Sequence, residues 1–191
     1  MIGRWLGNAL GHAMVAAIVL ITPANASAAA ACDAPPDALG KFSPSTDADP
    51  PPLTPFFDAA DVPRTFADFQ GEALVVNFWA TWCAPCVKEM PALDRLAEAV
   101  DGDGITVLAL SADREGADVV RAFYDVNALN NLAVSLDRRM AVSRALGIPG
   151  LPTTVLIDRD GREIGRLVGA AEWDAPEAVD FLRRCLTDAA G

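Results

Sequence analysis

The hydrophobic positions from residue 56 onward follow two alternating patterns. Short apolar runs rich in β-branched and aromatic residues, beginning with 74–79, are typical of buried strands. Between them, apolar residues recur every three or four positions, as where Leu93, Leu96 and Val100 share one face. The patterns predict helices over 83–100, 116–125 and 139–146, a last helix that opens at Pro176, and strands over 74–79, 105–110, 132–136, 153–157 and 163–168.

The order of these segments is strand–helix–strand–helix–strand–helix–strand–strand–helix. Strands that alternate with helices favour an α/β domain with a parallel core sheet. Asp160-Gly161 is a strong hairpin signal, so the last strand is expected to run antiparallel to its predecessor. Phe56-Phe57, followed by the turn-like residues 58–61, predicts a short strand and turn at the start of the domain, which we place at 56–191.

Two segments precede this domain. Residues 1–26 combine a positive start, an unbroken apolar stretch over 13–21 and a small-x-small site at Ala24-Asn25-Ala26, which is the layout of a secretory signal. Nine apolar residues are too few to span a bilayer. If the segment is counted from an earlier residue and includes polar positions, it is longer, so an uncleaved membrane anchor remains an alternative. Residues 27–55 contain seven prolines and no apolar period, which predicts an extended, mostly disordered linker.

Charge and histidine content narrow the possible functions. The formal net charge is −11 and the sequence pI is about 4.4, so we expect no nucleic-acid partner, because nucleic acids favour basic surfaces. The single histidine, His12, lies in the predicted leader. An exported and cleaved chain would therefore lack every triad or metal site that needs imidazole, and we expect no metal.

The motif Cys83-Ala84-Pro85-Cys86 lies where the first buried strand passes into a helix. A thiolate at a helix N-terminus is stabilised by free backbone N–H groups and by the helix dipole. A spacing of three places the second sulfur on the same helical face as the first. We therefore expect Cys83 to be the nucleophile and Cys86 to be the resolving thiol.

Two other interpretations of the motif are less favourable. A structural disulfide rarely closes so short a loop, because short loops gain little stability. A zinc site needs two further ligands, and the sequence has neither a second Cys-x-x-Cys nor a histidine outside the leader.

The residues around the motif resemble a known family. The segment 78–86 is similar to the active-site segment of the thioredoxin superfamily, and Gly150-Leu151-Pro152-Thr153-Thr154 is similar to its cis-proline segment. The resemblance narrows to the exported TlpA/ResA/CcmG-like thiol-disulfide oxidoreductases at residues 89–91, 105–125 and 157–161. Within that group, it is closest to the TlpA branch at residues 109–114 and 172–178. The resemblance implies a thioredoxin-like fold, with a central mixed sheet flanked by helices, an inserted strand–helix unit over 105–125 and an N-terminal hairpin.

The resemblance also implies roles at the site. Pro152 would follow a cis peptide bond opposite Cys83, and the backbone of Leu151 would meet the substrate. Trp82, Ala84 and Pro85 would add to the substrate-binding surface.

Asn77 departs from thioredoxin, which has a buried aspartate at this position. An amide cannot accept the proton that leaves when Cys86 attacks, so another acid must do so. Asp113, Glu115 and Glu89 are the candidates. Because relatives use an acid in the inserted unit, we assign Asp113, while each of the three also fits an ordinary solvated carboxylate.

Cys32 and Cys185 remain once Cys83 and Cys86 pair. In an oxidising compartment two idle thiols would be a hazard, so we predict a structural disulfide between them. The loop-entropy model gives such a long loop roughly 5 kcal/mol of stability. The alternative is a buried Cys185 with a free Cys32.

These observations predict an exported, monomeric protein disulfide reductase of the periplasm or cell envelope, which needs no cofactor. By resemblance, its clients would be apocytochrome c or copper-site assembly proteins for cytochrome oxidase, and its electrons would come from a membrane donor of the CcdA/DsbD type. The alternatives are a disulfide oxidase or isomerase, a copper-binding assembly protein, and a chaperone-like binding module whose thiols are incidental.

Overall fold

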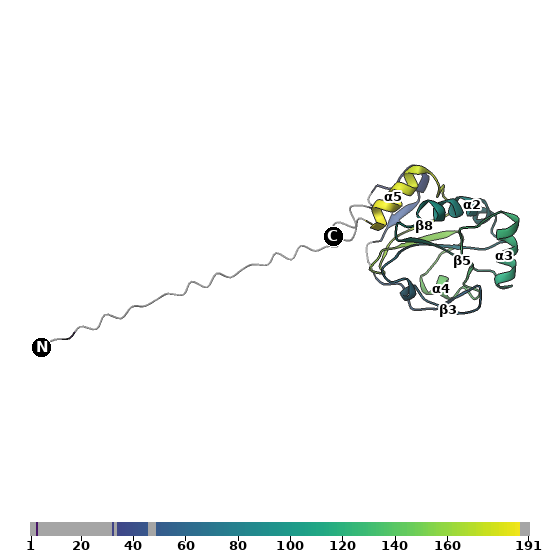
Figure 1. Cartoon of the computed structure of the whole chain (residues 1–191), viewed down its shortest axis with the longest axis horizontal. Helices are drawn as coiled ribbons and strands as arrows, with labels where there is room; N and C mark the ends of the chain where they lie inside the picture. The colour runs from purple at the N-terminus through teal and green to yellow at the C-terminus, as the bar shows by residue number, and fades with distance from the viewer. Residues whose placement is uncertain (1–2, 4–31, 33, 46–48, 188–191) are drawn as a thin grey trace.

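Strand β4 (Ala73–Trp79) runs through the middle of an eight-stranded sheet with the strand order β1-β8-β7-β4-β5-β6-β2-β3. The computed structural model describes residues 3, 32, 34–45 and 49–187 (Figure 1). The other strands are β1 (Phe42–Pro44), β2 (Phe56–Asp58), β3 (Pro63–Arg64), β5 (Ile105–Ser111), β6 (Ser135–Leu136), β7 (Thr153–Ile157) and β8 (Glu163–Val168). The helices are η1 (Asp37–Leu39), η2 (Phe66–Phe69), α2 (Ala84–Ala99), α3 (Ala117–Val126), α4 (Ala141–Ala145) and α5 (Pro176–Thr187).

The sheet is mixed, and helices lie on both of its faces. Strands β4, β5 and β6 are parallel, whereas β7 is antiparallel to β4 and β8 is antiparallel to β7. Figure 1 shows α2 and α5 on one side of the sheet and α4 on the other. The odd-numbered apolar residues of β4 pack in one core cluster with α2, α3 and α5, and the even-numbered ones pack in a second cluster with α4 and η2. Burial on both faces explains the unbroken apolar run in this part of the sequence.

The predicted order of strands and helices is confirmed, with differences at two boundaries. The strand expected over 132–136 is limited to Ser135–Leu136, and the helix expected over 139–146 is limited to Ala141–Ala145. The buried carboxylate of Asp137 explains the late start of the helix, because it accepts hydrogen bonds from the backbone N–H groups of Val142 and Ser143. It therefore caps the first turn of the helix.

Part of the predicted linker belongs to the fold, which corrects the assignment of 27–55. Phe42 opens edge strand β1, pairs with Leu167 of β8, and packs edge-on against Phe181 of α5 with 5.4 Å between ring centroids. Any side chain at Gly165 would collide with the Phe42 ring. The proline-rich composition concealed this strand, because proline in a sequence argues against a central strand. At a sheet edge, however, Pro44 is tolerated. The predicted leader, apart from Gly3, lies outside the described residues, and no helix within the described ranges is long and apolar enough to cross a membrane.

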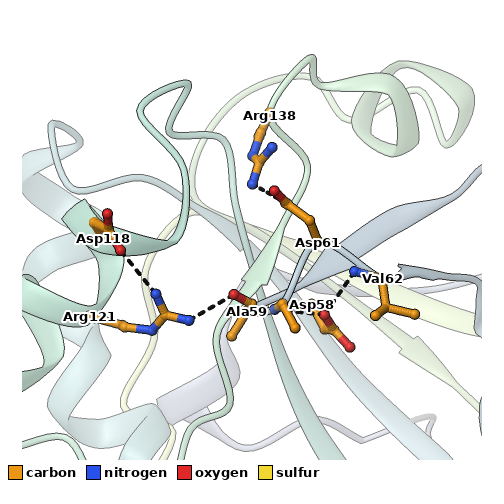
Figure 2. A network of polar contacts seen from close by, with 8 residues as sticks. Asp58, Ala59, Asp61, Val62, Asp118, Arg121 and Arg138 are labelled. Carbon is orange, nitrogen blue, oxygen red and sulfur yellow. Dashed lines mark hydrogen bonds and ion pairs between the residues drawn. The ribbon is translucent and has the colours of Figure 1, made fainter.

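The turn between β2 and β3 is held by polar contacts from two other elements (Figure 2). Arg121 of α3 donates from Nη2 to the carbonyl of Ala59 at 2.7 Å, and Arg138 of the β6–α4 loop pairs with Asp61. Within the turn, the Asp58 carboxylate accepts from the backbone N–H of Val62 at 3.0 Å. These contacts fix the predicted N-terminal hairpin against α3 and the loop before α4.

Candidate active site

The two motif cysteines lie at the junction of β4 and α2. Cys83 is the N-cap residue of α2 and forms a disulfide with Cys86, with 5.2 Å between their Cα atoms. Pro85 fits the first turn of the helix, where a missing N–H leaves no broken bond. Cys83 keeps 7% of its surface exposed and Cys86 keeps none. In this arrangement Sγ of Cys83 is accessible to a partner protein, whereas Sγ of Cys86 is accessible only to Sγ of Cys83.

The backbone N–H of Cys86 donates to Sγ of Cys83 at 3.4 Å. In the disulfide this sulfur is uncharged; in the reduced protein the same atom would carry the thiolate charge. An N–H group aimed at that charge, together with the N-terminal end of the α2 dipole, lowers the cost of ionising the thiol.

The loop between β4 and α2 is held by Asp113, which is 1% exposed. Its carboxylate accepts from the backbone N–H of Thr81 at 2.9 Å, from Thr81 Oγ1 at 2.7 Å and from Ser111 Oγ at 2.7 Å. Both carboxylate oxygens are therefore engaged in fixing the loop. The geometry gives Asp113 a positioning role in this loop, and its role as proton acceptor stays a prediction.

Glu89 is the buried acid on the same helical face as Cys86, one turn further along α2. Its Oε2 accepts from Trp173 Nε1 at 2.9 Å and from the backbone N–H of Ala171 at 3.0 Å, and its Oε1 accepts from Asn77 Nδ2 at 3.0 Å. Burial raises the pKa of Glu89 above its ordinary value, although the three hydrogen bonds act in the opposite direction. Glu115, the remaining candidate, is exposed.

Asn77 is a fully buried donor that links strand and helix. Besides Glu89, its Nδ2 donates to Thr154 Oγ1 of β7 at 2.9 Å. The strand thus supplies a neutral amide, and the neighbouring helix supplies the ionisable group. This arrangement provides an acid near the cysteines without an aspartate in β4.

The Leu151–Pro152 peptide bond is cis. The register of β4 and β7 pairs Phe78 with Thr153, so Pro152 lies level with the last residue of β4, just before the cysteine loop. Pro152 is buried and Leu151 is half-buried. The cis segment and the cysteine loop therefore lie at the same end of the sheet.

The surface around the disulfide is apolar and accessible. Trp82 is 66% exposed, and Ala84 and Pro85 are also exposed, as a substrate-binding surface requires. Trp79, by contrast, is fully buried and stacks on Tyr124 with 5.8 Å between ring centroids.

Cys32 and Cys185 form the second disulfide, with 5.0 Å between their Cα atoms and 153 positions between them in sequence. Both residues lie in the core cluster beneath α5. The bridge fastens the segment that leads into η1 to the last helix.

Sequence reasoning missed Trp173 and Thr154 as parts of the site. They lie 84 and 77 positions from the residues that they contact, Glu89 and Asn77. No local spacing marks such contacts, since they arise only when α2, β4, β7 and the segment before α5 pack together.

Comparisons with known proteins match the part of the chain that carries this site. The Redoxin family model matches residues 51–182. Thiol-disulfide oxidoreductase ResA from Bacillus thuringiensis strain Al Hakam is 35% identical over 102 residues, which cover 53% of this chain and 58% of ResA. ResA from Bacillus cereus strain ATCC 10987 is 37% identical over 120 residues, which cover 61% and 65%. The chain thus spans about three fifths of the length of these curated relatives.

Two solved structures are similar throughout the domain. A Chlorobium tepidum protein, described as thiol:disulfide interchange protein DsbE, has a TM-score of 0.62 and 25% identity over 77% of this chain and all of that one. A Neisseria meningitidis protein, described as a thioredoxin, has a TM-score of 0.61 and 29% identity over 76% and 96%. These likenesses match the thioredoxin-like mixed sheet.

Proposed function

The chain belongs to the Redoxin family, and we propose that it is an exported thiol-disulfide oxidoreductase that reduces disulfide bonds in client proteins. The observation that carries this proposal is the pairing of a partly accessible Cys83, at the N-cap of α2, with a fully buried Cys86. The cis peptide bond before Pro152 lies at the same end of the sheet and supports it further.

The reaction begins with the reduced protein. The Cys83 thiolate attacks one sulfur of the client disulfide, forms a mixed disulfide and releases the other client sulfur as a thiolate. The Cys86 thiolate then attacks Sγ of Cys83 and releases the second client thiolate. The client gains two electrons, and Cys83 and Cys86 are left as a disulfide.

Each turnover releases one proton from Cys83 and one from Cys86, and the two client thiolates can take them up. The Cys86 thiol is fully buried, so its proton needs an acceptor inside the protein. Glu89 is suited to this task, because its raised pKa brings it closer to neutral pH, where a carboxylate accepts a proton more readily. Asn77 and Trp173 hold the carboxylate in place while it does so.

The clients and the electron donor follow from the family resemblance and from the predicted leader. Apocytochrome c or a copper-site assembly protein would be the client, within cytochrome maturation in the periplasm. Because each cycle leaves Cys83 and Cys86 as a disulfide, a membrane donor of the CcdA/DsbD type would reduce this disulfide again. A leader that remains uncleaved would keep the domain near that donor.

The test uses an oxidised peptide and two variants. Cys83→Ser should abolish reduction, whereas Cys86→Ser should stop the reaction at a mixed disulfide that mass spectrometry can detect. Reduction by Cys83→Ser at the rate of the unaltered protein would refute the mechanism. The direction is tested by equilibration with glutathione: a potential near the thioredoxin value of about −270 mV supports a reductase, and one near about −120 mV supports an oxidase.

A further inference from the structure

Two hollows share Arg114, Arg138 and Arg139 in their linings, and one of them reaches Trp82. The smaller, of about 380 Å³, also includes Trp82 and Arg144 in its lining. The larger, of about 840 Å³, extends from the arginines to an apolar floor at Pro55 and Phe57. We call the surface formed by Arg114, Arg138, Arg139 and Arg144 the arginine groove.

The topology explains why the arginine groove adjoins the redox site. Trp82 follows β4, Arg114 follows β5, and Arg138 and Arg139 follow β6. These three strands are parallel neighbours, so the loops after them meet at one edge of the sheet. That edge is the usual ligand-binding position of open α/β sheets.

Positive charge is concentrated in the arginine groove, although the chain carries a net charge of −11. Arg138 pairs with Asp61, as Figure 2 shows, and Arg144 donates to the backbone carbonyl of Arg139. Within the described ranges, no carboxylate forms an ion pair with Arg114, Arg139 or Arg144.

The linings of the two hollows contain fewer carboxylates than guanidinium groups. Asp137 lines the larger hollow, but it is 3% exposed and its oxygens accept from Val142 and Ser143 at the start of α4. Glu115 lines the smaller hollow as a single exposed carboxylate. Several guanidinium groups thus face solvent beside Trp82, with donors free to bind carboxylates in pairs of hydrogen bonds.

We propose that the arginine groove docks a segment of the oxidised client that carries aspartate or glutamate a few residues from its disulfide. This inference rests on the proposed function and names the chemistry of its substrate. Trp82 covers the apolar part of the segment near the sulfur atoms, and the arginines bind its carboxylates. The groove also steers the encounter, because the rest of this acidic chain repels an acidic client. A polypeptide fits better than an anionic membrane surface, since the arginines line hollows that a flat bilayer would not enter.

The test compares three oxidised peptides of one sequence, with acidic, neutral or basic residues next to the disulfide. The reduced protein should react with the acidic peptide about tenfold faster than with the neutral one at low ionic strength, and the preference should disappear in high salt. Arg114→Glu or Arg139→Glu should abolish the preference. Arg184→Glu, which makes the same change of charge on an exposed arginine of α5, should retain it.

A second measurement separates docking from chemistry. In this measurement the acidic peptide carries serine in place of both of its cysteines. Calorimetry should detect its binding to the unaltered protein, and Arg114→Glu should remove that binding.

Equal reduction of all three peptides, or equal loss of the preference in Arg114→Glu and Arg184→Glu, overturns the docking proposal and leaves the redox function intact. Binding of the serine peptide without reduction of any peptide overturns the redox function instead. Binding to anionic vesicles, with no preference among the peptides, assigns the groove to a membrane and also overturns docking.

Discussion

Asn77 of β4 donates a hydrogen bond to Glu89 of α2, with 3.0 Å between Nδ2 and Oε1, and the two side chains are 0% and 3% exposed. The pair combines a neutral amide on the strand with a carboxyl group on the helix that carries Cys86. Because burial raises the pKa of Glu89, the pair can hold a proton at a pH where an exposed glutamate is already ionised.

Glu89→Gln should slow the attack of Cys86 on the mixed disulfide by on the order of 100-fold, because glutamine cannot accept the proton. The rate should also lose the pH dependence that the carboxyl group contributes. Rapid-mixing measurements of mixed-disulfide decay over a pH series test this prediction. Glu98→Gln, at an exposed position of α2, is the matched control; an unchanged pH profile in Glu89→Gln would exclude Glu89 as the acceptor.

The raised pKa of Glu89 also fixes the sign of a pH effect on stability. The folded carboxyl group keeps its proton at pH values where the unfolded chain has released it. Its contribution to the free energy of unfolding is complete below the ordinary pKa of 4.5 and is lost as the pH rises through the folded pKa. The unfolding free energy of the unaltered protein, minus that of Glu89→Gln, should therefore fall over this range in urea titrations; a constant or rising difference would contradict the pKa shift.

Trp173→Phe should raise the pKa of Glu89 further, because it removes the Nε1–H donor that favours the charged carboxylate. The pH midpoint of mixed-disulfide decay should move upward. Trp79→Phe is a close control, since Trp79 is also fully buried but its Nε1 has no hydrogen-bond partner within the described part of the chain. A midpoint that moves equally in both variants would point to altered packing rather than to the lost hydrogen bond.

Replacing Cys32 and Cys185 together by alanine should lower the free energy of unfolding by about 2–5 kcal/mol, because a loop of 153 positions is no longer closed in the unfolded chain. Chemical denaturation tests this, with Cys83 and Cys86 oxidised in both proteins. The reduction rate below the unfolding transition should stay the same, since the bridge fastens η1 and α5 rather than the cysteine loop. Equal stability of the two proteins would show that the bridge contributes nothing.

Asp113→Asn should lower stability by about 1–3 kcal/mol, because an amide cannot accept every hydrogen bond that Thr81 and Ser111 donate to the carboxylate. The rate of mixed-disulfide decay should fall as the loop before Cys83 loosens, but its pH midpoint should stay in place. Denaturation combined with a pH series measures both effects. A shifted midpoint would assign the proton-acceptor role to Asp113 instead of Glu89.

The periodicity of apolar residues was sufficient to predict most of the fold. The run at 74–79 and the hairpin signal at Asp160-Gly161 are local features, and the structure confirms a strand and a hairpin there. The three-residue strand at Phe42–Pro44 could not be predicted this way, because it is too short to show a period and depends on the exposed edge of β8.

The sequence by itself determined where the proposed redox chemistry lies, because strand, cysteine pair and helix are contiguous and a helix N-terminus activates a thiol by local forces. The tertiary structure alone decided which acid lies buried beside that chemistry and which surface adjoins it. The pKa of Glu89 is raised by burial, which exists only once the chain is packed, and Arg114, Arg138 and Arg139 meet only because three parallel strands end at one edge. Burial and proximity depend on packing between distant segments, and no local pattern in the chain records them.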